Sequence, residues 1–314
     1  MNSRQNNGKI ALFSALMLVL LYGSSFLVEL PQVEYPFSPL TSSLISEETF
    51  GKGISFILAA LALLLTSFIA GPSVATTYMA MAAISPLAIA ITPVHCAVLA
   101  LAISIMFITR PPDRKNTIGN AFATTISLGI ASLFFVPLVW LFPLFLIMIF
   151  SDTEEKGKVA VASLFGLFLP VAIIIGIAFI KDNNQALSIF SKEFGVLFSS
   201  VPRHFSIKLL TLLRIIQTIG LALAAAVSVK RRIDRFTVHE YRLYTRIMMI
   251  AIALSIVCLI YLCSPSDPYG IVISLPLSLL LCEYFTGGEL SSTEKTATVT
   301  LILTIIAERI TFLI

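Results

Sequence analysis

The sequence predicts an all-α fold, a polytopic bundle of about eleven transmembrane helices. Hydrophobic stretches recur along the whole chain, and most have close to the roughly 20 apolar residues that a helix needs to cross a hydrocarbon core of about 30 Å. Of the 314 residues, 57% are hydrophobic and only 12% are charged. A water-soluble fold could not bury so much apolar surface, so we expect one integral membrane domain over residues 1–314.

The first predicted span, residues 10–28, follows Arg4 and Lys9. It is long for the apolar region of a signal peptide and lacks an A-x-A cleavage motif, so we expect it to be retained. The next two spans cover 53–71 and 75–91. Because Pro86 and several polar residues interrupt the stretch 72–92, that stretch is expected to be either a weak crossing or a broken, re-entrant helix.

Eight further spans are predicted from their apolar length, and proline punctuates several of them. Proline inside a helix frees a backbone carbonyl and kinks the helix, which a membrane tolerates only where neighbouring protein satisfies that carbonyl. The prolines in question are Pro93, Pro137, Pro143, Pro170 and Pro276. The spans are 93–109, 120–136, 137–151, 158–180, 209–229, 243–263, 270–286 and 297–314.

Lys and Arg gather in three loops, 1–9, 110–116 and 230–242. Positively charged loops remain in the cytoplasm, so we expect a cytoplasmic N-terminus and a C-terminus on the outer, periplasmic side. The loop 151–158 falls on the cytoplasmic side although it is net acidic, since acidic residues contribute little to orientation. The run from Lys230 to Arg235 is expected to anchor the protein to anionic lipid.

The two long outer loops are 29–52 and 181–208. Within the second, residues 185–200 place Leu and Phe at helical spacing, with Ser, Lys and Glu largely on the other side. This pattern predicts an amphipathic helix that lies in the outer membrane interface.

Composition excludes several kinds of site. The net charge of +4 does not indicate nucleic-acid binding, because the basic residues lie mostly in short loops that set orientation. The four cysteines lack C-x-x-C or Cys/His spacing and are expected to be small apolar residues of the spans. They are Cys96, Cys258, Cys263 and Cys282. We expect no cofactor and no metal, and membrane lipids as partners; the sequence does not identify a protein partner.

Charged residues inside apolar spans are the best pointers to function, because each costs about 2.5–3.5 kcal/mol at the bilayer centre. Arg214 and Gln217 lie below the outer surface in the eighth span, at a depth comparable to that of Glu308 in the last. Arg214 would then reach for the headgroups, pair with Glu308, or bind an anion. Arg246 and Glu283 lie within a turn of the inner surface and are expected to be interfacial.

A second group of polar residues is assigned to the outer face above Arg214. The carboxylates there could act as a general base, and the arginines and histidines could hold a phosphate. Solvated loop residues with no such role are the alternative. The group comprises Glu29, Glu34, His95, Arg203, His204 and Asp267.

Residues 119–175 contain a small-residue helix with the motif G-I-A-S-L-F-F-V-P, an aromatic span, a short charged loop and an L-F-G-L-F-L-P helix. Together with the preceding segment around Pro86 and Pro93, this order resembles an uncharacterised family of roughly 300-residue polytopic inner-membrane proteins of Bacteroidota. That family usually carries Arg and Trp in the loop that is S-D-T-E-E-K-G-K here. The resemblance implies a cell-envelope protein and assigns no catalytic residue.

Three classes of function remain open. An envelope glycosyltransferase that uses a polyprenyl-phosphate-linked sugar at the outer face is favoured by the acidic first outer loop, the interfacial helix and the outer arginines. Glu29 or Glu34 would be the catalytic base, and Arg203, His204, Arg214, Gln217 and His95 would bind the phosphate or ligand. A transporter or lipid flippase would need broken helices, of which only 72–92 qualifies. A non-catalytic assembly or scaffold protein needs none of these polar residues.

Overall fold

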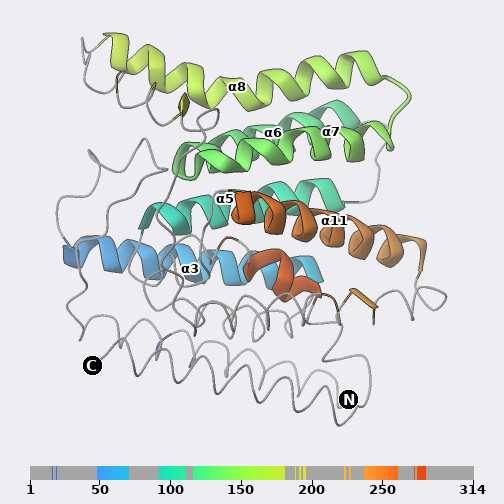
Figure 1. Cartoon of the computed structure of the whole chain (residues 1–314), viewed down its shortest axis with the longest axis horizontal. Coiled ribbons are helices and arrows are strands. Elements are labelled where there is room, and N and C mark those ends of the chain that lie inside the picture. Colours follow the sequence, from blue (N-terminus) through green and yellow to red (C-terminus); the bar gives the residue numbers. More distant parts are fainter. Residues whose placement is uncertain are drawn as a thin grey trace.

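A computed structural model describes residues 48–70, 92–110, 116–180, 237–260, 272 and 274–280, together with a few isolated positions. Every described element is a helix, and the described residues contain no strand (Figure 1). The predicted all-α class is therefore confirmed for this part of the chain. The number of membrane crossings stays a prediction.

The helix bounds follow the predicted spans closely, with two exceptions at their starts. The first described helix begins at Glu48, inside the predicted outer loop 29–52, and the last begins at Val238, inside the predicted loop 230–242. The helices are α3 (Glu48–Ala70), α5 (Thr92–Thr109), α6 (Thr117–Phe134), η2 (Val136–Leu141), α7 (Phe142–Phe150), α8 (Lys156–Ile180) and α11 (Val238–Ile260).

The predicted span 137–151 is not one α-helix. It consists of the 3₁₀ helix η2 followed by the nine-residue helix α7, and the second residue of each is a proline, Pro137 in η2 and Pro143 in α7. Proline favours the first helical turn, where its missing N–H leaves no hydrogen bond unmade. Because a 3₁₀ helix rises about 2 Å per residue and an α-helix about 1.5 Å, the two together extend over about 25 Å.

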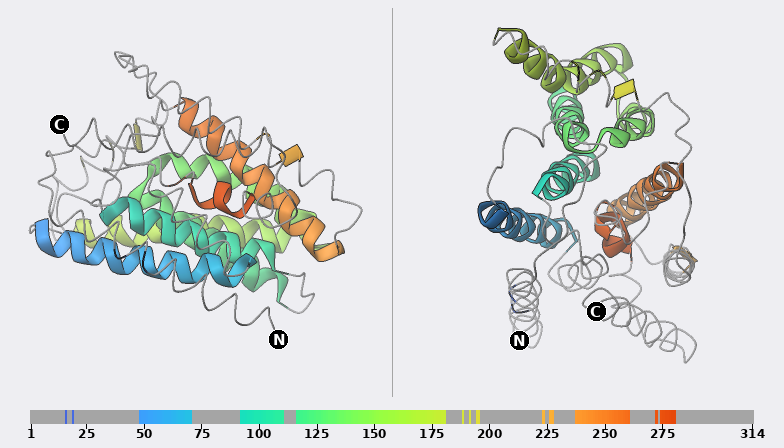
Figure 2. Two further views of the ribbon diagram at one scale, coloured as in Figure 1. Left: turned by 90° about the horizontal axis from the view of Figure 1, so that it is seen from below. Right: turned by 60° about the vertical axis from the view of Figure 1, so that its left-hand side comes forward.

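The helices lie side by side in a layered bundle in which α8, α6, α5 and α3 follow one another across the molecule (Figures 1 and 2). Helix α7 lies beside α6, and α11 crosses the same side near α5 and η2. The C-termini of α5 and α7 and the start of α11 meet at one end of the bundle, which we call the Arg246 end after a residue described below. The opposite end, where η2 carries Trp140, is the Trp140 end. Helix α3 runs in the same direction as α5 (Figure 1).

Two glycines let α6 and α8 approach closely. A Cβ added to Gly129 of α6 would lie 2.6 Å from the carbonyl oxygen of Leu167, and one added to Gly166 of α8 would lie 2.9 Å from that of Phe122. The hydroxyl of Thr125 would be closer still to the second Cβ. Small residues at such positions bring helix backbones together and increase their van der Waals contact.

Two described helical segments, Thr117–Phe134 and Lys156–Ile177, are long and apolar enough to cross a membrane. Three shorter apolar segments accompany them, Gly53–Ile69, Val94–Thr109 and Val136–Phe150. The two long segments differ in burial, since half of the first is buried inside the protein but only 22% of the second. Helix α6 is therefore central in the described bundle, and α8 lies at its edge.

We expect Gly166→Ala to lower the free energy of unfolding by about 1–3 kcal/mol, because the new methyl group meets backbone atoms that cannot move aside. Gly176→Ala in the same helix is the matched control, since a Cβ there meets nothing within 4 Å. The control should be neutral or stabilising by up to about 1 kcal/mol, the helix-propensity gain of alanine over glycine. Thermal or denaturant unfolding in detergent measures both, and equal stabilities would contradict the close contact.

Candidate functional site

The most developed polar arrangement among the described residues is an ion-pair cluster at the Arg246 end. It consists of Arg242 and Arg246 of α11 and of Asp152, which follows α7. The side chains are 23%, 6% and 16% exposed in that order, so Arg246 is the most deeply buried. The interfacial depth predicted for Arg246 stays a prediction, and the structure adds that its guanidinium lies inside the protein.

Arg246 has acceptors in two separate segments of the chain, the end of α5 and the stretch from Met148 to Asp152. Its Nη1 donates to the carbonyl oxygen of Ile108 in the last turn of α5. Its Nη2 donates to the carbonyl oxygen of Met148 near the end of α7 at 3.2 Å, to the hydroxyl of Ser151 at 3.4 Å and to Oδ1 of Asp152 at 2.5 Å. The last carbonyls of a helix lack intrahelical partners and carry the negative end of its dipole. Arg246 therefore caps two helices and pairs with a carboxylate at once.

Asp152 is held for this role by the local backbone. Its N–H donates to the carbonyl oxygen of Ile149 at 3.0 Å, and the Ser151 hydroxyl donates to that of Met148 at 2.6 Å. The same carboxylate oxygen also forms an ion pair with Arg242. Because Arg242 and Arg246 are one helical turn apart, both reach this single carboxylate from one face of α11.

The start of α11 is fixed by a capping box. The backbone N–H and the hydroxyl of Thr237 donate to Oε2 of Glu240 at 2.8 and 2.9 Å, and the N–H of Glu240 donates to the Thr237 hydroxyl at 3.3 Å. These backbone and side-chain hydrogen bonds lower the pKa of Glu240 below its usual value. The cap is therefore complete above the ordinary carboxylate range and weakens as the pH falls through the lowered pKa.

The cluster's chemistry is that of a structural clamp. The positive charges of the two arginines are opposed by one carboxylate and by the carbonyl ends of α5 and α7. No group of three or more His, Cys, Asp or Glu side chains among the described residues could hold a metal ion.

Of the predicted site residues, the structure describes only His95. Its side chain is 1% exposed and lies in the first turn of α5, at the Trp140 end. Ile108 lies 13 residues further along α5, about 20 Å away at 1.5 Å per residue, so His95 is far from the ion-pair cluster. The other predicted residues lie outside the described residues: Glu29, Glu34, Arg203, His204, Arg214, Gln217, Asp267, Glu283 and Glu308.

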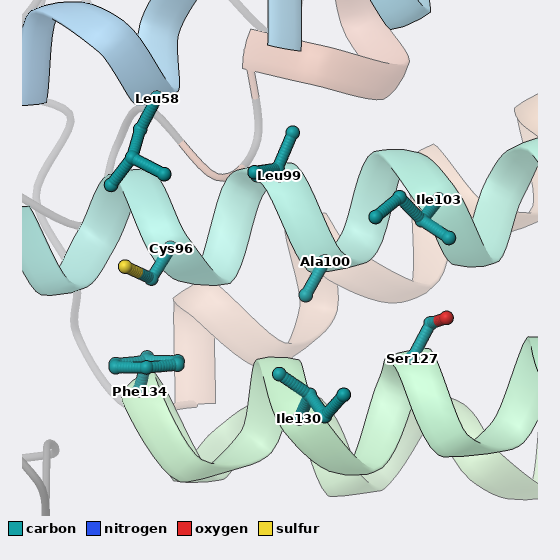
Figure 3. A pocket seen from close by; sticks show the side chains of 8 residues that line it. All are labelled: Leu58, Cys96, Leu99, Ala100, Ile103, Ser127, Ile130 and Phe134. Carbon is teal, nitrogen blue, oxygen red and sulfur yellow. The ribbon is translucent and has the colours of Figure 1, made fainter. Parts of the chain in front are cut away.

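An apolar pocket of about 220 Å³ lies between α3, α5 and α6 (Figure 3). Its lining residues are Leu58 of α3, Cys96, Leu99, Ala100 and Ile103 of α5, and Ser127, Ile130 and Phe134 of α6. Cys96 is a free thiol and is half-buried there. The sequence did not indicate this pocket, because its lining residues are ordinary members of apolar spans.

The amphipathic helix predicted over 185–200 is described only at isolated positions. Ser188, Ser191, Phe194 and Gly195 are helical, with both serines exposed and Phe194 half-buried. These positions agree with the predicted pattern, and the rest of the segment lies outside the described residues.

We expect Asp152→Ala to lower the free energy of unfolding by about 3–5 kcal/mol, because it leaves two partly buried guanidinium groups without their carboxylate. Lys158→Ala is the control; it breaks a 3.1 Å ion pair with Glu155 whose side chains are 69% and 55% exposed. Such an exposed pair contributes at most about 1 kcal/mol. Unfolding in detergent measures both variants, and equal losses would show that the cluster has no special role.

A family model described as a family of unknown function (DUF6427) matches residues 44–310. No curated protein and no solved structure matches the chain. The match includes the segment 119–175 on which the resemblance to an uncharacterised family was based, and it extends well beyond that segment on both sides. The chain thus belongs to the DUF6427 family, a family of unknown function.

Proposed function

We propose that the chain is an integral membrane protein that crosses an inner membrane with its Arg246 end in the cytoplasm. The observation that supports a membrane location best is the surface of α8. Large apolar side chains are exposed along most of this helix, among them Phe165, Phe168, Ile173 and Ile177. Contiguous apolar surface of this size is unfavourable in water and is the expected surface toward lipid.

The two ends of the bundle support the orientation. Three of the loops assigned to the cytoplasm are 110–116, 151–158 and 230–242. They contain Asp152 or lie within a few residues of Ile108 and Arg246, and Arg246 contacts both Ile108 and Asp152. Loops assigned to one side of the membrane thus border one end of the bundle. At the other end the single tryptophan of the chain, Trp140, is 47% exposed, as suits a residue at a membrane–water interface.

Cysteine labelling in intact cells tests this orientation. In a variant whose four native cysteines are replaced, single cysteines at Ser42 and Asn183 should react with a membrane-impermeant maleimide. Cysteines at Asp113 and Glu154 should react only after the cells are permeabilised. Labelling of the cysteine at Glu154 in intact cells would show that the orientation is the reverse. Release of the protein from membranes by alkaline carbonate would refute an integral membrane location.

We propose further that the protein is an envelope glycosyltransferase that acts at the outer face on a polyprenyl-phosphate-linked sugar. The supporting observation is that the Arg246 end is closed by ion pairs and helix caps. The titratable residues assigned to the outer face are expected at the opposite end, where His95 lies. In this mechanism Glu29 or Glu34 takes the proton of the acceptor hydroxyl, whose oxygen then bonds to the anomeric carbon.

The bond from the anomeric carbon to the phosphate oxygen breaks in the same step, and the phosphate leaves with its lipid. Arg203 and Arg214 would stabilise the negative charge that develops on the phosphate, and His204, Gln217 and His95 would help to bind it. A scaffold protein with the same bundle would need none of these groups, and a flippase would need the charges near mid-membrane to be exposed in turn to both sides.

Comparative profiling of glycans and lipid-linked sugars in a deletion strain tests the enzyme. Deletion should remove one glycan and accumulate its lipid-linked precursor, and wild-type protein should restore the profile. Glu34→Gln and Arg214→Ala should be made at normal level yet fail to restore it, whereas Lys158→Ala should restore it fully. An unchanged profile on deletion would eliminate the enzyme and leave the scaffold or the flippase.

A further inference from the structure

The apolar pocket between α3, α5 and α6 has no role in the proposed reaction. It is open on one side, and its lining comes from helices adjacent in the layered bundle (Figure 3). On α6 the lining residues run from Ser127 to Phe134, the half of that helix nearer the Trp140 end. In the proposed orientation the pocket therefore lies at the depth of the outer leaflet.

The pocket offers no polar group that needs a ligand. The Ser127 hydroxyl already donates to the carbonyl oxygen of Ala123 at 2.8 Å. The thiol of Cys96 is a weak hydrogen-bonding group that behaves as a small apolar residue. The remaining lining residues are Leu58, Leu99, Ala100, Ile103, Ile130 and Phe134. A water molecule needs two to four polar partners, so water is a poor occupant of this space.

Exposed apolar side chains accompany the pocket on two of its three helices. Ile130, which lines it on α6, is 39% exposed, and Ile57 and Leu61, close to Leu58 on α3, are more exposed still. An unfilled void costs free energy because its walls lose dispersion contacts on one side. The phase that would touch this opening is the hydrocarbon of the bilayer, which is present in excess over any other apolar ligand.

We propose that this pocket binds the end of one acyl chain of a bilayer phospholipid from the outer leaflet, an inference that rests on the proposed membrane location and not on the proposed reaction. The volume of about 220 Å³ exceeds that of an engineered apolar cavity of about 150 Å³ that binds benzene, so it is large enough for several methylene groups of an acyl chain. The headgroup would stay at the surface on the Trp140 side.

The proposal is tested by filling the pocket of the folded protein with a chemical group on Cys96 and counting the phospholipids that stay bound. A variant that keeps Cys96 but lacks the other three cysteines is reconstituted in vesicles of phosphatidylethanolamine and phosphatidylglycerol, treated with hexyl methanethiosulfonate and returned to mild detergent. Native mass spectrometry should show one phospholipid fewer per chain than after treatment with methyl methanethiosulfonate, which adds only a small cap. Equal numbers of retained phospholipids would overturn the proposal.

A second arm fills the same space by mutation. Ala100→Phe should lose the same phospholipid, and Ala172→Phe, which enlarges an exposed position of α8, should retain it. With polyprenyl phosphate added to the vesicles, the phospholipid should remain the bound species, and exclusive retention of the polyprenyl chain would overturn the acyl-chain assignment. Resistance to carbonate extraction tests the membrane location independently. A protein that resists extraction but loses no phospholipid when the pocket is filled would therefore contradict the acyl-chain proposal alone.

Discussion

A guanidinium group buried between helices needs acceptors for its N–H groups, and this requirement fixes α11 against the rest of the described bundle. Arg246 finds its acceptors at the C-terminus of α5 and in the segment that contains the C-terminus of α7 and Asp152, two segments brought together only by the folded protein. Sliding α11 by one turn would move the guanidinium of Arg246 about 5.4 Å along the bundle, away from the carbonyl oxygens of Ile108 and Met148. The apolar contacts of α11, through Ile247, Ile250 and Leu254, specify its position far less sharply.

The contact between α6 and α8 depends on a different constraint, the absence of side chains. Gly129 and Gly166 are placed where each helix meets the backbone of the other, so shape rather than charge determines the contact. A polar link of the same kind of precision joins α5 to α6, where the Ser104 hydroxyl donates to the carbonyl oxygen of Thr124 at 2.8 Å. Helices that are apolar on all sides need such local features, because hydrophobicity alone does not select which face turns inward.

This also explains what the sequence could and could not predict. Apolar length located α5, α6 and α8 to within a few residues, because each stretch ends at polar residues, as at Asn116 and Lys156. It did not reveal that Pro137 and Pro143 divide one stretch into η2 and α7, since composition is the same on both sides of the break. The inward direction of the Arg246 side chain was not predicted, because depth along a helix can be read from the sequence, whereas the direction of a side chain around an apolar helix cannot. Arg246 lies three residues after Leu243 and four before Ile250, so it shares a helix face with these two apolar residues. This spacing was the signal that the side chain points into the protein.

The ion-pair cluster at the Arg246 end also has a consequence for the opposite end of the protein. Charged groups at the Arg246 end are used to hold helices together, and a group so used is not free to act on a substrate. The described helices are thereby held at one end, while the apolar pocket and His95 lie toward the other. Chemistry on a lipid-linked substrate needs an opening toward the membrane and titratable groups near the headgroups. In the proposed orientation the apolar pocket lies toward the Trp140 end, where the titratable residues assigned to the outer face are expected. A clamp at the cytoplasmic end would keep that outer end in a fixed geometry without taking part in the reaction.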